Sequence, residues 1–128
     1  MSESTRRILL AEDDRFLRKA AETALKRRGF AVLAAVDGEE ALRMARTEAP
    51  DLILLDLIMP KLQGFEVLRA LKADAATAAT PVIILSNLGQ DSDVKQAMEA
   101  GAVGYFVKAN LSLQDLVKKV GETLGGTG

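Results

Sequence analysis

The sequence predicts an α/β fold: a doubly wound sheet of five parallel strands with helices on both faces. Five short apolar runs alternate with five amphipathic segments, the pattern of the βα units that build parallel sheets. The run at residues 52–55 has four apolar residues in succession, as expected for a strand buried on both faces. A chain of 128 residues has the size of one domain. We therefore expect a single domain over residues 1–128, with residues 125–128 as a flexible tail.

The first strand and helix are expected near the N-terminus. Residues 8–11 form the strand, and acidic residues follow it at once. Of these, Asp14 is expected to cap the next helix, because an aspartate at this position accepts hydrogen bonds from free backbone N–H groups. Gly29 is a suitable C-terminal stop. The apolar stripe of this helix is expected to consist of Leu17, Ala20, Ala21, Ala24 and Leu25.

A second strand–helix unit leads to the central strand. The strand is expected at residues 30–35, and Asp37 with Glu40 three residues later resembles a capping box at the start of a helix. Pro50 separates this helix from the strand at residues 52–55. The buried side of the helix is expected to carry Ala41, Leu42 and Ala45.

The second half of the chain continues the alternation. A turn at residues 61–64 opens a third helix, and the Ala- and Thr-rich residues 73–80 are expected to be the helix end and a loose connection. Strands are expected at residues 81–86 and 103–107, with a helix at 91–100 between them. The inward residues of the last three helices are expected to be Phe65, Leu68 and Leu71; Val94, Ala97, Met98 and Gly101; and Leu113, Leu116, Val117, Val120 and Leu124, the last helix being capped by Ser112 with Asp115.

Composition excludes several classes of site. The chain contains no cysteine and no histidine, so disulfides, thiolate metal sites and catalytic histidines are ruled out. Its 17 basic and 18 acidic residues nearly cancel, which gives no sign of direct nucleic-acid binding. No apolar run reaches the ~18 residues of a membrane span, and the N-terminus does not resemble a signal peptide. A cytoplasmic protein with no membrane contact is expected.

Polar side chains stand at four of the predicted strand ends. Glu12 and Asp13 follow the first strand, Asp56 the third, Ser86 the fourth and Lys108 the fifth. Because the carboxyl ends of parallel strands share one edge, these side chains are expected to converge. Periodicity alone leaves the strand orders 3-2-1-4-5 and 2-1-3-4-5 open. The acids favour the flavodoxin-like order 2-1-3-4-5, since only that order makes the first and third strands neighbours.

These strand-end residues have the chemistry of a phosphoryl-transfer site. Three carboxylates that lie together repel one another unless a cation is present, and oxygen ligands without His or Cys select Mg²⁺ or Mn²⁺. A cation, a lysine and a hydroxyl around Asp56 describe a site with Asp56 as the nucleophile. Each residue alone could be a cap, a turn residue or a solvated side chain. Their joint placement favours the site.

The sequence resembles the receiver domain of bacterial two-component response regulators, including the single-domain chemotaxis type. The likeness covers roughly residues 7–124 and rests on four segments in order: ILLAEDD, DLILLDLIMPKLQGFEVL, PVIILS and AGAVGYFVK. Each segment is weak evidence alone, and together they are highly specific. The chemotaxis member is a known example of the order 2-1-3-4-5, so the resemblance implies the same topology.

The resemblance also implies a role for each site residue. Asp56 is expected to accept a phosphoryl group from a sensor histidine kinase, a phosphotransfer protein or a small phosphodonor. Asp13 would bind Mg²⁺ directly, Glu12 through water and Ile58 through its backbone carbonyl, with Asp56 as a further ligand. The remaining residues are the phosphate-binding Ser86 and Lys108 and the aromatic switch Tyr105. A phosphoryl group adds about −1.5 to −2 of charge, which can draw a hydroxyl and a lysine inward.

The expected output is recruitment of a downstream protein through the face of the fourth helix, fifth strand and fifth helix. On this interpretation the chain is a switch that catalyses only its own phosphorylation and dephosphorylation, as a monomer or a phosphorylation-promoted dimer. Two alternatives remain: a Mg²⁺-dependent phosphohydrolase with an aspartyl nucleophile, and an inert flavodoxin-like docking module. The first lacks an acid two residues after Asp56, and the second lacks a glycine-rich phosphate loop.

Two positions, 109 and 87, depart from the family pattern, and two others bear on hydrolysis of the phosphoryl group. Ala109 stands where the family usually has proline after the lysine, so the Lys108–Ala109 bond is expected to be trans with a rearranged loop. Asn87 replaces a smaller residue and is expected to narrow the access to Asp56. Ile58 and Leu88 are apolar at positions that influence hydrolysis of the phosphoryl group, and neither can orient a water molecule. Slow self-dephosphorylation is therefore expected.

Overall fold

The computed structural model describes residues 5–125 of the chain. Its strands are β1 (Arg7–Ala11), β2 (Ala31–Ala35), β3 (Leu52–Asp56), β4 (Val82–Ser86) and β5 (Gly104–Val107). Its helices are α1 (Arg15–Arg27), α2 (Gly38–Glu48), α3 (Gly64–Ala73), α4 (Asp91–Glu99) and α5 (Leu113–Thr123), with a short 3₁₀ helix at Lys108–Asn110. The expected tail at residues 125–128 lies outside the described residues apart from Gly125.

The predicted sheet order is confirmed. All neighbouring strands are parallel, in the order β2-β1-β3-β4-β5, and the order 3-2-1-4-5 is excluded. Ala11 at the end of β1 pairs with Leu55 of β3, and Asp56 pairs with Leu85 of β4. The register therefore places Glu12, Asp56 and Ser86 at one edge of the sheet.

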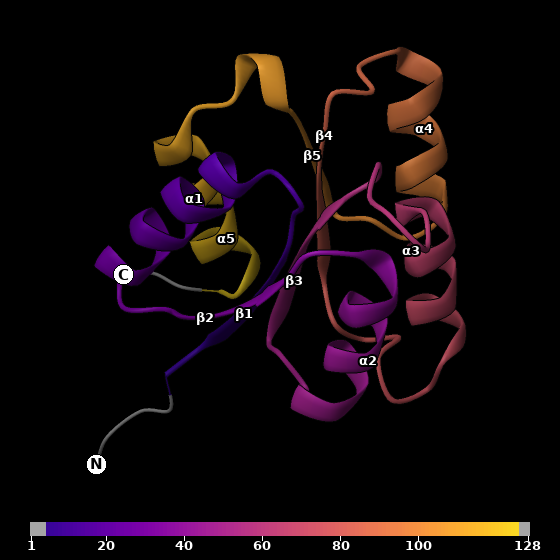
Figure 1. The fold of residues 1–128 in the computed structure, drawn as a ribbon, viewed down its shortest axis with the longest axis horizontal. Coiled ribbons are helices and arrows are strands. Elements are labelled where there is room, and N and C mark those ends of the chain that lie inside the picture. Colours follow the sequence, from indigo (N-terminus) through magenta and orange to yellow (C-terminus); the bar gives the residue numbers. More distant parts are fainter. Residues whose placement is uncertain (1–4, 126–128) are drawn as a thin grey trace.

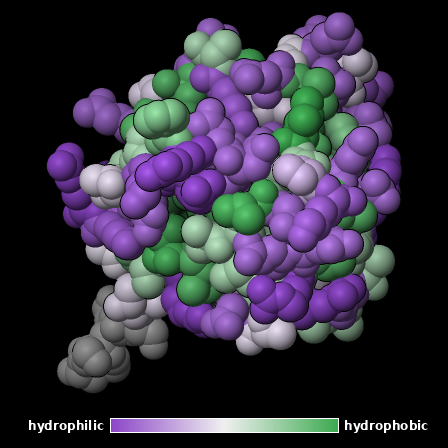
Figure 2. Space-filling model, in the orientation of Figure 1, coloured by the Kyte–Doolittle hydropathy of each residue, from purple (hydrophilic) through white to green (hydrophobic). Residues whose placement is uncertain are grey.

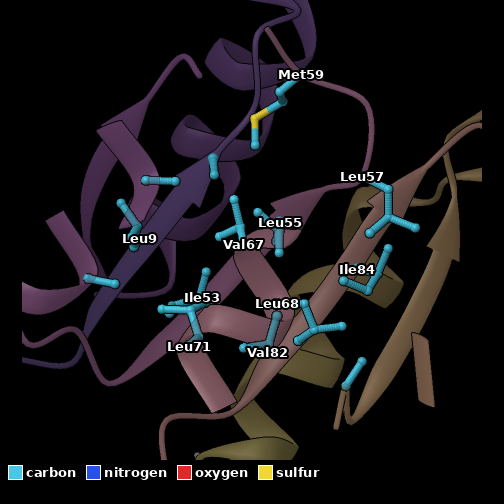
Figure 3. Packing of buried hydrophobic residues seen from close by; sticks show 14 of the residues in the cluster. Leu9, Ile53, Leu55, Leu57, Met59, Val67, Leu68, Leu71, Val82 and Ile84 are labelled. Atoms are coloured by element: carbon cyan, nitrogen blue, oxygen red, sulfur yellow. The ribbon is translucent and has the colours of Figure 1, made fainter. Parts of the chain in front are cut away.

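The sheet separates two layers of helices. Helices α1 and α5 cover one face, and α2, α3 and α4 cover the other (Figure 1). Successive strand residues point to opposite faces: Leu54 packs with the α1 and α5 layer, whereas Ile53 and Leu55 pack with α2 to α4. The side chains in the second layer interdigitate with Val67, Leu68 and Leu71 of α3 (Figure 3).

Side-chain caps begin three of the helices as predicted. Asp14 accepts hydrogen bonds from the N–H groups of Phe16 and Leu17, and Asp37 accepts one from Glu40. Ser112 accepts one from Asp115. Each bond satisfies a backbone donor that has no partner inside its own helix.

The structure corrects the expected orientation of two helices. Ala20 is exposed rather than part of the apolar stripe of α1, because the buried face of this helix is centred on Ala21 and Leu25, which pack on α5 and the sheet. Met98 in α4 is 43% exposed, and Ala97 is the fully buried residue of that helix. Val103, expected to begin β5, lies outside the strand and is 40% exposed.

Residues 73–80 are ordered, contrary to the expectation of a loose connection. The hydroxyl of Thr77 is buried and donates to the carbonyl of Leu71 at 2.7 Å. The Lys72 ammonium donates to the carbonyls of Ala78 and Thr80 at 3.1 and 2.8 Å. Partial burial lowers the pKa of Lys72. The hydrophobic periodicity did not predict an ordered segment at residues 73–80, because hydrogen bonds from polar side chains, rather than an apolar stripe, hold it in place.

The loop after β3 is anchored on the start of α2. The Gly38 N–H donates to the carbonyl of Pro60 at 3.2 Å, and a Cβ atom at position 38 would lie 1.9 Å from the carbonyl oxygen of Leu62. The Lys61 ammonium lies 3.6 Å from an oxygen of Asp37, and Lys61 has a positive φ of 72°. Glycine at position 38 thus lets the loop approach α2 closely.

The visible surface in Figure 2 is mainly hydrophilic, with apolar side chains in separate small areas. Within residues 5–125, no helix combines the length and the apolar character that crossing a bilayer requires.

We predict that Gly38→Ala destabilises the protein by at least about 2 kcal/mol, because the new methyl group displaces the loop at Leu62. Gly121→Ala is the matched control: it also lies in a helix and its Cβ would meet nothing within 4 Å. This control should be neutral or stabilise by up to about 1 kcal/mol. Denaturant unfolding of both variants measures the difference, and equal stabilities would contradict the prediction.

Candidate functional site

The tips of β1 and β3 bring three acidic side chains together. Carboxylate oxygens of Glu12, Asp13 and Asp56 lie within 4.8 Å of one another. Glu12 and Asp56 are buried, with exposed fractions of 0% and 2%, whereas Asp13 is exposed. The expected convergence of these residues is therefore found. It follows from the register, which sets Glu12 beside Asp56 on neighbouring strands.

Lys108 bridges the two buried acids. Its Nζ lies 2.8 Å from Oε2 of Glu12 and 2.7 Å from Oδ2 of Asp56, and its side chain is 14% exposed. Burial acts to lower the pKa of Lys108, but the hydrogen bonds and charges of Asp56 and Glu12 outweigh it and raise the pKa. The ammonium group is therefore a resident counter-charge for the carboxylates.

The buried position of Glu12 perturbs its titration. Burial raises its pKa from 4.5 to about 7, against the opposing effect of its hydrogen bonds with Lys108 and with the N–H of Asp14. Both bonds use Oε2. Oε1 is buried and has no hydrogen-bond partner among residues 5–125, and a buried acceptor in this state is costly.

Asp56 is held at both of its oxygens. Oδ2 accepts from Lys108, and Oδ1 accepts from the N–H of Ile58 at 3.0 Å. Gly64 packs against the backbone here: a Cβ at that position would lie 2.4 Å from the carbonyl oxygen of Asp56. The loop after β3 thus fixes the carboxylate as well as the backbone around it.

Ser86 and Tyr105 both contact the loop after β4. The Ser86 hydroxyl is buried and accepts from the N–H of Leu88 at 3.2 Å. The hydroxyl of the half-buried Tyr105 donates to the carbonyl of Leu88. Burial raises the pKa of Tyr105. Tyr105 also packs against the hydrophobic layer of α2 to α4.

One contact near the acids was not foreseen from the sequence. Arg18 lies outside the apolar stripe expected for α1, and its Nη1 donates to the backbone carbonyls of Glu12 and Asp13 at 3.0 and 3.4 Å. The available signal was its position four residues after Asp14, since helical side chains lean toward the N-terminus and can reach over the first turn.

The donor set fits a hard divalent cation. Three carboxylates gather at one point, and the unpartnered Oε1 of Glu12 offers a further oxygen. These are the ligands that Mg²⁺ prefers, together with backbone carbonyls and water. The departure at Ala109 is also visible: the Lys108–Ala109 bond is trans, as is every peptide bond within the described residues, and it lies inside the 3₁₀ helix Lys108–Asn110.

Comparison with known proteins gives a consistent result. The family model described as the response regulator receiver domain matches residues 8–121. Protein PilH of Pseudomonas aeruginosa is 35% identical over 120 residues, which are 94% of this chain and 98% of PilH. The gliding motility regulatory protein of Myxococcus xanthus is 40% identical over 89% of this chain, but the chain spans only 15% of that protein's length.

A solved structure resembles the fold closely. It is the receiver domain of a sensor histidine kinase from Pseudomonas aeruginosa PAO1, with a magnesium ion coordinated in the active-site cleft of that protein. The TM-score is 0.86 at 27% identity, and the match covers 96% of this chain and 100% of the other.

We predict a pH dependence that originates from Glu12. Because its pKa rises from 4.5 to about 7 on folding, the folded state binds this proton more tightly than the unfolded state does. Glu12 should therefore make the free energy of unfolding fall as the pH rises from about 4.5 to about 7. Glu12→Gln should flatten this slope, whereas Glu66→Gln on the exposed side of α3 should retain it.

Denaturant unfolding between pH 4.5 and 8 measures these slopes, and carbon NMR of the Glu12 carboxyl group measures the titration directly. A Glu12 midpoint near 4.5 would contradict the prediction. In Lys108→Ala the midpoint should move upward, because the hydrogen bond and the charge of the lysine lower the pKa of Glu12.

Proposed function

Because this chain belongs to the response regulator receiver domain family, we propose that it is a phosphorylation-controlled switch whose phosphoacceptor is Asp56. The main support for this proposal is the position of the Asp56 carboxylate. It lies at the end of a strand, is 2% exposed, and belongs to the acidic cluster. Its Oδ2 lies 2.7 Å from the Lys108 ammonium. A buried aspartate with this setting is suited to act as a nucleophile toward phosphorus.

The proposed reaction is transfer of one phosphoryl group. An Asp56 carboxylate oxygen forms the new bond to phosphorus, while the bond from phosphorus to the donor's imidazole nitrogen breaks and its electron pair stays on that nitrogen. For acetyl phosphate the leaving group is acetate. The N–H of Ile58 holds Oδ1 in place, and Lys108 has to move only from Oδ2 to the incoming group.

The proposed cofactor is Mg²⁺, with Mn²⁺ as the alternative ion. Asp13 and Asp56 would hold it directly, Glu12 through water, and Ile58 through its backbone carbonyl. When bound, the ion offsets the negative charge that the phosphoryl oxygens bring to this acidic cluster. Lys108 contributes to the same end as a fixed positive charge.

The proposed switch connects Asp56 with the face of α4, β5 and α5. Ser86 would donate its hydroxyl to the phosphoryl group and Lys108 would pair with it, which draws the loop after β4 inward. Tyr105 lies on β5, and its hydroxyl donates a hydrogen bond to the carbonyl of Leu88 in that loop. Met98 and Val103, which are 43% and 40% exposed, add apolar contact area for a downstream protein near this face.

The proposed phosphodonor is a sensor histidine kinase or phosphotransfer protein, with no direct role for nucleic acid or a membrane. We propose that residues 1–128 act as one receiver domain in the cytoplasm, as a monomer or as a dimer that phosphorylation promotes. The chain spans 15–44% of the length of several longer relatives.

The phosphohydrolase and the inert docking module fit less well. A hydrolase of this type needs an acid to protonate its leaving group, and the position two residues after Asp56 carries Ile58, which is 56% exposed. An inert module has no use for a buried Glu12 and Asp56 bridged by a lysine. Steady turnover of a phosphate ester by the purified chain would favour the hydrolase.

We predict that acetyl phosphate with Mg²⁺ modifies Asp56. Intact-mass spectrometry should show one added phosphoryl group in the wild-type chain, and none in Asp56→Ala or when EDTA is present. Asp91→Ala, which removes an exposed aspartate at the start of α4, is the control and should be labelled normally. Labelling of Asp56→Ala at the wild-type level would refute the assignment.

We predict slow loss of the phosphoryl group, because the side chains at positions 58 and 88 cannot orient an attacking water. Ile58→Asn should speed hydrolysis several-fold by supplying a polar group beside Asp56, and Ile58→Leu should not. The decay of phosphorylated protein after removal of the donor measures the rate. A wild-type lifetime of seconds that Ile58→Asn leaves unchanged would contradict this mechanism.

A further inference from the structure

Arg18 lies behind the acidic site rather than in it. Its Nη1 donates to the carbonyls of Glu12 at 3.0 Å and Asp13 at 3.4 Å, both in the loop between β1 and α1. These are the backbone carbonyls of the two residues whose carboxylates meet Asp56. The same short stretch of chain thus presents its side chains to the site and its carbonyls to Arg18.

The rest of the loop is held unevenly. Glu12 is fixed on several sides: its N–H donates to Ala35, and Oε2 accepts from Asp14 and Lys108. Asp13 is exposed, and its carboxylate makes no hydrogen bond within residues 5–125. The hydrogen bond from Arg18 to the Asp13 carbonyl therefore helps to set the orientation of the Asp13 carboxylate, which few other contacts hold.

The position and chemistry of Arg18 suit this role. It stands one helical turn after the cap residue Asp14, and its side chain leans toward the N-terminus of α1. Its planar guanidinium carries five donors in a fixed arrangement, and it contacts two successive carbonyls at once. Arg18 is half-buried, so water competes less for these bonds than it would at an exposed residue.

We propose that Arg18 is a positioning residue that holds the β1–α1 loop so that Asp13 and Glu12 face the Asp56 site. The inference rests on the proposed function, because it concerns the readiness of these carboxylates for Mg²⁺. Arg18 touches neither the ion's expected ligand atoms nor Asp56. It acts through the backbone of the loop.

Charge and positioning make opposite predictions for this residue. A permanent positive charge beside an acidic cluster disfavours a second cation, so removal of Arg18 should tighten Mg²⁺ binding if only its charge mattered. Loss of the loop contact should instead weaken binding, since groups that orient metal ligands are worth about 10- to 100-fold in affinity. The sign of the change therefore separates the two effects.

The test is titration of Mg²⁺ alone into the full chain, followed by NMR and calorimetry, for the wild type, Arg18→Ala, Arg18→Lys and Arg15→Ala. Arg15 is the matched control, because it carries the same charge on the first turn of α1, is exposed, and makes no hydrogen bond or ion pair within the described residues. We expect Arg18→Ala to bind Mg²⁺ about tenfold more weakly, and Arg15→Ala to bind it equally or slightly more tightly.

Arg18→Lys keeps the charge but not the planar fork, so its affinity should fall between those of the wild type and Arg18→Ala. Amide hydrogen exchange in the metal-free proteins should show faster exchange at residues 13 and 14 in Arg18→Ala, with the strands unchanged. Affinity in Arg18→Ala that equals or exceeds the wild-type value would overturn the inference. Should that variant fail to fold, unchanged affinity in Arg18→Lys would overturn it as well.

The wild-type titration separates this inference from the function on which it rests. A wild-type chain that takes up no Mg²⁺ would contradict the proposed function. A wild-type chain that binds Mg²⁺, with Arg18 variants that bind it equally well, would contradict only the role of Arg18.

Discussion

The bridge from Lys108 to Glu12 and Asp56 is the interaction on which the site depends. It joins the ends of β1, β3 and β5 through two bonds of 2.8 and 2.7 Å. Removing one partner of such a buried pair typically lowers the free energy of unfolding by about 3–5 kcal/mol, because the remaining charge is left uncompensated. The charge of these two buried acids is compensated by a lysine that lies 52 residues beyond Asp56 in the sequence. The same three side chains thus hold the strand ends together and form the proposed reactive site.

The backbone around Asp56 is fixed from a second direction by α2. Because position 38 is a glycine, the loop after β3 can lie closer to the start of α2 than a side chain at that position would permit. The Lys61 ammonium in this loop also lies beside Asp37, at the start of the same helix. Ile58, which donates to Asp56, belongs to this loop. The carboxylate is thus oriented by a packing contact on one side and by an ammonium group on the other. A reactive group held in this way needs little reorganisation before it reacts.

The sequence predicted the strands, their order and the meeting of Glu12, Asp13 and Asp56, because apolar runs and strand-end residues are local signals and a parallel sheet converts them into one edge. It failed where tertiary packing chooses among similar residues. Ala20 and Ala21 are equally apolar, but the packing of α1 on α5 and the sheet buries Ala21 and leaves Ala20 exposed. Thr77 and Arg18 act through hydrogen bonds to backbone carbonyls, and the apolar periodicity used to predict the helices does not detect such partners.

Within residues 5–125, the two hydrophobic layers on either side of the sheet share no buried side chain. A substitution among the buried residues of α1 and α5 therefore removes no side chain from the buried cluster of α2, α3 and α4. The groups at the strand tips belong to neither layer, since they extend from the sheet itself. The reactive groups at the strand ends can in this way stay the same while substitutions on the outer helices change the surface that partner proteins contact.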